Sequence, residues 1–153
     1  MLRIIANGLT PEIYEELREK VGFQAYEQQD VAIALNNTLF SVVVYDGRRP
    51  IGIGRVVGDD RIVFFIKDVV VDPDYQSKAV GKVIMLALNE YIEEKACANA
   101  YVALMATPHT EEFYKKLGFI QRPTDTLGHG MVKYVHVNEN LNNSTTMKEV
   151  VGS

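Results

Sequence analysis

The stretch from Asp68 to Lys82, DVVVDPDYQSKAVGK, constrains the fold of this 153-residue chain more strongly than its other segments do. It begins with an apolar run typical of a buried strand, breaks at Pro73, and continues with the periodicity of an amphipathic helix. A strand, a short polar loop and a helix N-terminus place several unpaired backbone N–H groups in a small volume, where the helix dipole favours negative charge. The stretch therefore predicts a binding site for a phosphate or pyrophosphate group.

The rest of the chain predicts a mixed α/β domain in which strands and helices alternate. The dipeptide Asp46-Gly47 indicates a hairpin turn, and the run from Arg61 to Val71 is apolar on both faces, apart from Asp68 on one of them, as a central strand would be. Strands are expected over 2–6, 39–45, 50–57, 61–71, 101–105 and 131–137, and helices over 10–22, 26–35, from 80 onward, and 110–117.

Composition excludes several classes of protein. The content of 47% hydrophobic and 24% charged residues is ordinary for one globular domain, and no apolar run is long enough for a membrane span. A net charge of −4 argues against a protein that binds nucleic acid through its phosphates. Without an apparent signal peptide, and with Cys97 as the single cysteine, the cytoplasm is the expected location. The expected domain covers 1–137 and is followed by a polar tail, 138–153.

Two motifs in the same order and at the same separation resemble those of the GNAT superfamily of N-acetyltransferases. The valines at 69–71 followed by QSKAVG at 76–81 are similar to the acetyl-CoA signature Q/R-x-x-G-x-G/A. The segment EFYKKLGF at 112–119 is similar to the family's second motif, F-Y-x-x-x-G-F. The segment from Gln121 to Met131 further resembles arylalkylamine and glucosamine-type members. The resemblance implies a single-domain, mostly antiparallel sheet with helices on both faces and a splayed central strand pair.

The resemblance also implies acetyl-CoA as the cofactor and assigns the residues that bind it. Backbone groups of the strand are expected to pair with the pantetheine arm, and N–H groups of the loop to surround the pyrophosphate. These cofactor-binding residues are Val69, Val70, Val71, Gln76, Ser77, Lys78, Ala79, Val80, Gly81 and Lys82. Ala79 stands where the signature has its first glycine, and we expect it to adopt helical geometry and keep its N–H at a small cost.

Two residues are the candidates for catalysis. The family's tyrosine corresponds to Tyr114, which is expected to protonate the departing thiolate, although a packing role on its short helix is the alternative. Asp68, on an otherwise apolar strand, is expected either to attract or deprotonate the amine, or to form a structural hydrogen bond with a loop or with Arg55. His109 and His129 have suitable pKa values for a base but are equally consistent with solvated loop positions.

Two functions follow from these residues. The first is an acetyl-CoA-dependent N-acetyltransferase in which a small-molecule primary amine attacks directly in a ternary complex, with Asp68 favouring a cationic acceptor. The second is a non-catalytic acyl-CoA-binding sensor, which Ala79 favours and Tyr114 opposes. No residue cluster has metal-ligand spacing, and neither nucleic acid nor membrane is expected as a partner. A homodimer is expected to form through the strand at 131–137.

Overall fold

The computed structural model describes residues 1–77 and 79–136, which form two compact units, one from Met1 to Met105 and the other from Ala106 onward. Lys78 and the predicted polar tail lie outside the described residues. No helix of the described residues combines the length and the apolar character needed to cross a bilayer.

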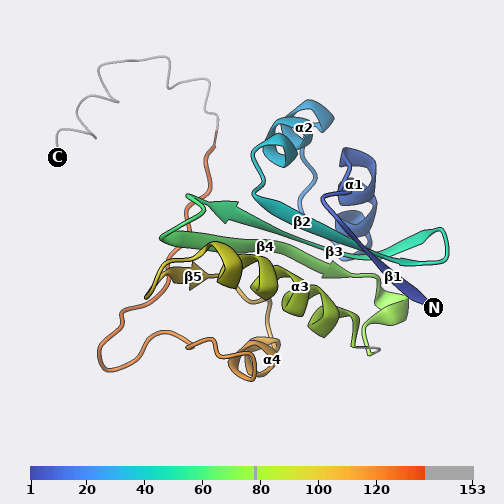
Figure 1. The fold of residues 1–153 in the computed structure, drawn as a ribbon. Coiled ribbons are helices and arrows are strands. Elements are labelled where there is room, and N and C mark those ends of the chain that lie inside the picture. The colour runs from blue at the N-terminus through green and yellow to red at the C-terminus, as the bar shows by residue number, and fades with distance from the viewer. Residues whose placement is uncertain (78, 137–153) are drawn as a thin grey trace, which may run out of the picture. The chain divides into compact units, whose positions relative to one another are not determined.

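The first unit contains a five-stranded sheet covered by helices on both faces (Figure 1). Four antiparallel strands lie in chain order, and a short fifth strand runs parallel to the fourth. The strands are β1 (Leu2–Ala6), β2 (Phe40–Asp46), β3 (Arg49–Gly58), β4 (Val63–Val71) and β5 (Tyr101–Ala103). The helices are α1 (Pro11–Lys20), α2 (Gln28–Asn36), the 3₁₀ helix η1 (Pro73–Tyr75) and α3 (Val80–Lys95). This confirms the predicted mixed, mostly antiparallel α/β fold.

Local sequence explains where these elements begin. The Thr10 hydroxyl accepts a hydrogen bond from the Ile13 amide at 3.3 Å, and Pro11 occupies the first turn of α1. The β2–β3 hairpin turns at Gly47, whose φ of 60° lies in the left-handed region open to glycine. The hairpin turn at Asp46-Gly47 and a helix in the region of α1 were both expected from the sequence.

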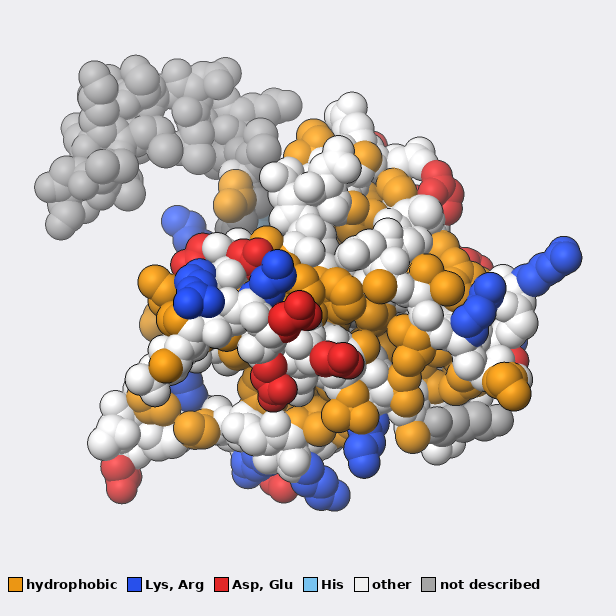
Figure 2. All heavy atoms as spheres, viewed as in Figure 1, with side chains coloured by type: hydrophobic (Ala, Val, Ile, Leu, Met, Phe, Trp, Pro, Cys, Tyr) orange, Lys and Arg blue, Asp and Glu red, His pale blue; other side chains and the backbone are white. Residues whose placement is uncertain are grey.

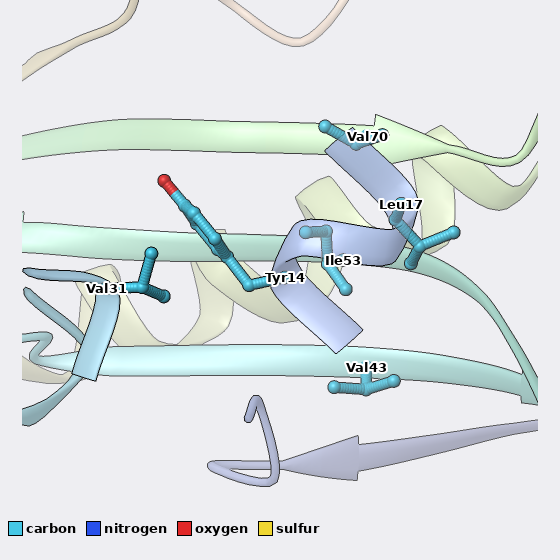
Figure 3. Close-up of a cluster of buried hydrophobic side chains, with 6 residues drawn as sticks. All are labelled: Tyr14, Leu17, Val31, Val43, Ile53 and Val70. Atoms are coloured by element: carbon cyan, nitrogen blue, oxygen red, sulfur yellow. The ribbon is translucent and has the colours of Figure 1, made fainter. Parts of the chain in front are cut away.

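The core of the first unit lies on both sides of the sheet. On the α1–α2 face, Figure 3 shows a buried cluster in which the Tyr14 side chain extends from α1 across β3 toward β4. Its members are Tyr14, Leu17, Val31, Val43, Ile53 and Val70. On the opposite face α3 buries Val80, Ile84, Met85, Leu88 and Ile92. Burial of these apolar side chains supplies most of the stabilisation that holds the helices to the sheet.

Two glycines in β3 set how closely α3 approaches the sheet. A Cβ on Gly54 would lie 2.6 Å from Ile84 Cγ2, and one on Gly52 would lie 2.9 Å from Val80 Cγ1. Both separations are shorter than van der Waals contact, so only glycine allows α3 to lie this close. The N-terminus of α3 is thereby held against the strands that precede the predicted phosphate-binding loop.

A β-bulge interrupts the regular alternation expected for β4. Ile53 pairs with Val70 and Arg55 with Lys67, so Gly54 lies opposite two residues rather than one. One of them, Asp68, has a φ of 57°, a left-handed conformation that is unusual inside a strand. The side chains of Lys67 and Asp68 consequently point toward the α1 side, where Asp68 accepts a hydrogen bond from Tyr14 and Lys67 lines the same cavity as Tyr14. The expectation of strict alternation through Asp68 was therefore wrong.

The predicted splay of the central strands is present. β4 pairs with β5 only through residues 63–65, and β5 ends at Ala103. From Ile66 to Val71, no residue of the described chain pairs with β4 on the β5 side. One edge of the bulged half of β4 is therefore left without a strand partner.

The second unit contains one short helix, α4 (Glu111–Lys115), among its described residues. The predicted strand over 131–137 is not observed in its described part, since residues 131–136 have no regular secondary structure. An extended segment becomes a strand only when its N–H and C=O groups pair with a neighbouring strand, and no such pairing is recorded for these residues. Apolar alternation in the sequence does not supply such a partner, so the predicted strand was wrong for these residues.

Candidate functional site

The predicted cofactor loop leads from β4 through η1 into the N-terminus of α3. Gln76, Ser77 and Ala79 are exposed, Val80 is fully buried, and Lys78 lies outside the described residues. The first-turn N–H groups of α3 have no side-chain cap. This end of the helix therefore offers backbone donors and a favourable dipole to an anion, and the binding of a phosphate there stays a prediction.

Ala79 is the N-cap of α3 and has φ 62° and ψ 16°. The helical geometry expected for this residue was wrong, because the chain turns into the helix through a left-handed residue at this point. That conformation costs an L-residue roughly 1–2 kcal/mol relative to the right-handed one. Alanine thus occupies a conformation natural to the signature's glycine, and the loop keeps this shape at an energetic cost.

Asp72 anchors the beginning of this loop. Its amide donates to the Ile51 carbonyl at 2.8 Å, and its carboxylate accepts from the Asp74 amide at 2.9 Å. Lys20 Nζ and Arg49 Nη2 each lie 2.9 Å from Asp72 Oδ2. Burial alone would raise the pKa of this carboxyl, but these hydrogen bonds outweigh burial and lower the pKa to about 2. Asp72 therefore holds the start of the loop in place against the end of the sheet.

A second charged cluster surrounds Asp68 on the α1 face of the bulge. Asp68 Oδ2 accepts hydrogen bonds from Tyr14 Oη and Arg55 Nε, each at 2.9 Å. Asp68 Oδ1 lies 3.4 Å from Arg18 Nε and 3.5 Å from Lys67 Nζ. The hydrogen bond with Arg55 is the one that the structural interpretation of Asp68 expected. The role of Asp68 in catalysis stays a prediction.

The electrostatics of this cluster favour an ionised Asp68. Burial would raise the pKa of its carboxyl, yet the hydrogen bond from Arg55 and the charges of Lys67 and Arg18 together lower it. Burial and the neighbouring carboxylate raise the pKa of Tyr14 to about 12, so its hydroxyl stays protonated and donates. An ionised carboxylate held by two arginines is a weak proton acceptor.

A cavity of about 130 Å³ opens beside this cluster, between helices α1 and α2 and the sheet. Its lining includes Tyr14, Tyr26, Asp30, Val31, Arg55 and Lys67. The charged groups in and behind it are three cations (Arg18, Arg55, Lys67) and two carboxylates (Asp30, Asp68), so the surroundings are net positive. By contrast, acidic and basic side chains are interspersed on the face shown in Figure 2.

Tyr114 lies in α4 of the second unit and is half-buried. Its ring meets those of Phe113 and Phe119 edge to face, with centroids 5.0 and 6.0 Å apart. Burial raises the pKa of its phenol, which keeps the group protonated near neutral pH. Packing and proton donation are both compatible with this environment. His109 and His129 are exposed.

The structure thus brings the cofactor loop, the open edge of β4 and the Asp68 cluster into one unit. Sequence reasoning did not predict Tyr14, Arg18 or Lys67 as site residues. One signal was available, because Tyr14 and Arg18 lie four residues apart and share a helix face. Lys67 required knowledge of the bulge, which turns its side chain into the cavity.

Comparison with known proteins identifies the family. Residues 8–136 match the acetyltransferase (GNAT) domain family. The chain is 34% identical over 130 residues to the GCN5-related N-acetyltransferase 1, chloroplastic, of Arabidopsis thaliana, covering 84% of this chain and 65% of that relative. It is 30% identical over 118 residues to an uncharacterized N-acetyltransferase of Pyropia yezoensis, covering 74% of this chain and 67% of that protein.

Among solved structures, the fold is similar to that of a probable acetyltransferase of Staphylococcus aureus. The TM-score is 0.79 with 36% identity, covering 88% of this chain and 100% of the other. The chain spans about two thirds of the length of the curated relatives, so the family match rests on their shared domain. The chain therefore belongs to the GNAT family of acetyltransferases, whose chemistry is acyl transfer.

Proposed function

We propose that this protein is an acetyl-CoA-dependent N-acetyltransferase that acetylates a primary amine of a small molecule by direct attack in a ternary complex. The observation that supports this most directly is the open edge of β4 beside the uncapped N-terminus of α3, in a chain of this family. The catalytic domain in this proposal covers 1–137, and 138–153 is a tail outside it. When bound, acetyl-CoA supplies a thioester and an anionic pyrophosphate.

In this proposal the backbone performs most of the binding. N–H groups between Gln76 and Lys82 hold the pyrophosphate, and the unpaired edge of Val69–Val71 aligns the pantetheine arm by strand-like hydrogen bonds. A strand N–H near Val70 polarises the thioester carbonyl. Val70 as a whole residue is 2% exposed and its side chain packs in the core cluster, so we assign its part in binding to the backbone edge.

Tyr114 is proposed as the acid that protonates the departing thiolate. Support comes from its place in the F-Y-K-K-L-G-F motif and from the raised pKa of its phenol. For Asp68 we propose an electrostatic role, in which its carboxylate orients Arg55 and Lys67 at the cavity. No side chain is assigned as the general base. In this proposal either water takes the proton from the amine or the acceptor binds as the neutral amine.

A thiol-release assay with acetyl-CoA and a panel of amines, with mass detection of the acetylated product, tests this function. We expect turnover with at least one amine. Binding of CoA without turnover of any amine would contradict the proposal and support the sensor alternative.

Replacement of Tyr114 by Phe tests the proton donor. We expect CoA binding to persist and turnover to fall about 10- to 100-fold, since general acid catalysis typically contributes 10²–10⁴-fold and water replaces part of it. Phe113→Leu in the same helix is the packing control, and we expect it to retain most of the turnover. Equal turnover of wild-type protein and Tyr114→Phe across the pH range would remove Tyr114 from the mechanism.

We also propose a homodimer and a cytoplasmic location. The segment 131–136 exposes Met131, Val132, Tyr134 and Val135, and apolar surface of this kind is a common part of subunit interfaces. The Arabidopsis relative is named chloroplastic, which describes that plant protein. Light scattering after size exclusion and fractionation of the source cells test the two statements.

A further inference from the structure

We infer that the cavity beside the bulge binds an anionic group of the acceptor, a carboxylate or a phosphate, and that Lys67 selects it. The inference rests on the proposed function and names the class of acceptor: a small amine that carries a negative charge. It replaces the earlier idea that Asp68 attracts a purely cationic amine.

Asp68 is out of reach of an ammonium group, because its Oδ1, although it accepts no hydrogen bond, is buried behind Arg18 and Lys67. Its side chain is fully buried, and it accepts hydrogen bonds from Tyr14 and Arg55 while Arg18 and Lys67 lie within ion-pair distance. A positively charged substrate at this point would approach three cations arranged around one carboxylate. Coulomb repulsion in the partly desolvated cavity opposes that approach.

Lys67 is the group that offers positive charge to the cavity. Its side chain is 46% exposed, and its recorded ion pair is the long one, 3.5 Å, to Asp68 Oδ1. An ammonium group carries three N–H donors, so this contact leaves donors for a ligand. The bulge at Asp68 explains the orientation, because without the extra residue Lys67 and Asp68 would face opposite sides of β4.

The remaining wall of the cavity limits which anion fits. Tyr14 and Tyr26 bring phenol groups, Val31 is apolar, and Asp30 is an exposed carboxylate in the first turn of α2. Asp30 opposes a highly charged ligand, while Arg55 and Lys67 on the sheet side counter it. Ligand pockets usually measure about 300–1,000 Å³. A cavity of about 130 Å³ therefore holds one functional group, with the amine extending from it.

The experiment compares matched acceptors on wild-type protein and Lys67 variants. Alanine is compared with alaninamide, and glucosamine 6-phosphate with glucosamine, as ratios of kcat/KM. The two members of a pair differ in amine basicity, which affects their kcat/KM ratio in every protein. The test is therefore whether this ratio changes between wild-type protein and the Lys67 variant. Lys67→Gln should lower the preference for the charged member about tenfold or more, the effect of losing a charged hydrogen bond.

Three further variants distinguish an effect on recognition of the acceptor's charge from an effect on the folded structure. Lys67→Arg should keep the preference, and Lys67→Glu should reverse it toward an acceptor with a second ammonium group, such as putrescine. Lys95→Gln removes the same charge from an exposed site at the end of α3 and should leave the ratios as in wild type. If Lys67→Gln changes the alanine-to-alaninamide ratio more, the preferred anion is a carboxylate. If it changes the ratio for glucosamine 6-phosphate and glucosamine more, the preferred anion is a phosphate.

A binding measurement decides the inference even when turnover is absent. N-acetylalanine should shift NMR signals of wild-type protein at lower concentration than N-acetylalaninamide, and Lys67→Gln should remove the difference. Equal binding of the two probes, or ratios unaffected by Lys67→Gln, would overturn the inference. Failure of the proposed function gives a different result, namely carboxylate binding without acetylation of any amine.

Discussion

Asp68 and Asp72 lie four residues apart, at the bulge and just beyond the end of β4, and each is held by one cation from α1 and one from β3. Asp68 lies against Arg18 and Arg55, whereas Asp72 lies against Lys20 and Arg49. Both side chains are almost completely buried, at 0% and 2% exposure. The same arrangement nevertheless produces two different sites.

The difference lies in the solvent exposure of the partners. Arg18 and Arg55 are 7% and 11% exposed, so Asp68 is removed from water together with its two arginine partners, and only Lys67, at 46% exposure, stays hydrated. Lys20 and Arg49 are 33% and 47% exposed, so the cations around Asp72 remain hydrated. Removing one partner of a buried ion pair leaves an uncompensated charge in the interior and is strongly destabilising. Removing the partner of a hydrated cation costs little, because water still solvates that cation. The comparison indicates that Asp68 shapes the cavity and that Asp72 fixes the cofactor loop.

The largest effect is expected for Asp68→Ala. Two buried arginines then lose their carboxylate, and breaking such a pair typically lowers the free energy of unfolding by about 3–5 kcal/mol. Urea denaturation measures the loss. Asp74→Ala is the matched control, because its carboxylate is 73% exposed and its ion pair with Arg49 is at the surface. Similar free energies of unfolding for Asp68→Ala and Asp74→Ala would show that the buried ion pairs of Asp68 stabilise the fold no more than a surface ion pair does.

Asp72→Ala should have a smaller effect on stability. It removes the side-chain cap of η1, and loss of such a cap costs roughly 0.5–2 kcal/mol. We expect the KM for acetyl-CoA to rise as well, because the loop loses its anchor. Asp72→Asn retains a capping side chain and should recover most of the stability. An unchanged KM in Asp72→Ala would show that the loop holds its shape without this anchor.

The same residue predicts a dependence of stability on pH. The folded pKa of Asp72 is about 2 and its ordinary value is 3.8, so the unfolded chain takes up the proton first as the pH falls. The stabilisation by Asp72 is therefore complete above about pH 4 and disappears between about pH 4 and pH 2. The difference in unfolding free energy between wild type and Asp72→Asn should shrink over this window. A constant difference would contradict the lowered pKa.

The smallest effect is expected for Ala79→Gly, and it has the opposite sign. Relief of the left-handed conformation gains roughly 1–2 kcal/mol, and the extra unfolded-state entropy of glycine returns about 0.4–1 kcal/mol. The net gain in stability should be about 0.5–1 kcal/mol, with CoA affinity equal or better. Ala87→Gly within α3 should destabilise instead and serves as the control. A large loss of affinity in Ala79→Gly would show that the loop adopts another shape when it binds CoA.

Most of the fold was predictable because its elements are marked by local residues. Thr10 and Pro11 begin α1, Gly47 turns the hairpin, and the valines of β4 indicate a buried strand. The strand over 131–136 was mispredicted because alternation does not supply a pairing partner. The left-handed Ala79 was missed because alanine carries no local mark of that conformation.

By itself, the sequence determined the order of the strands and helices up to α4 and the family, since each depends on short-range periodicity or contiguous motifs. Only the tertiary structure decided what Asp68 does. The bulge opposite Gly54 turns Lys67 and Asp68 to the same side, and α1 brings Tyr14 and Arg18 from more than forty residues away. The charge around a site depends on such long-range contacts. Asp68 is a carboxylate, yet it lies behind a cavity whose surroundings are net positive, because Arg18, Arg55 and Lys67 gather around it.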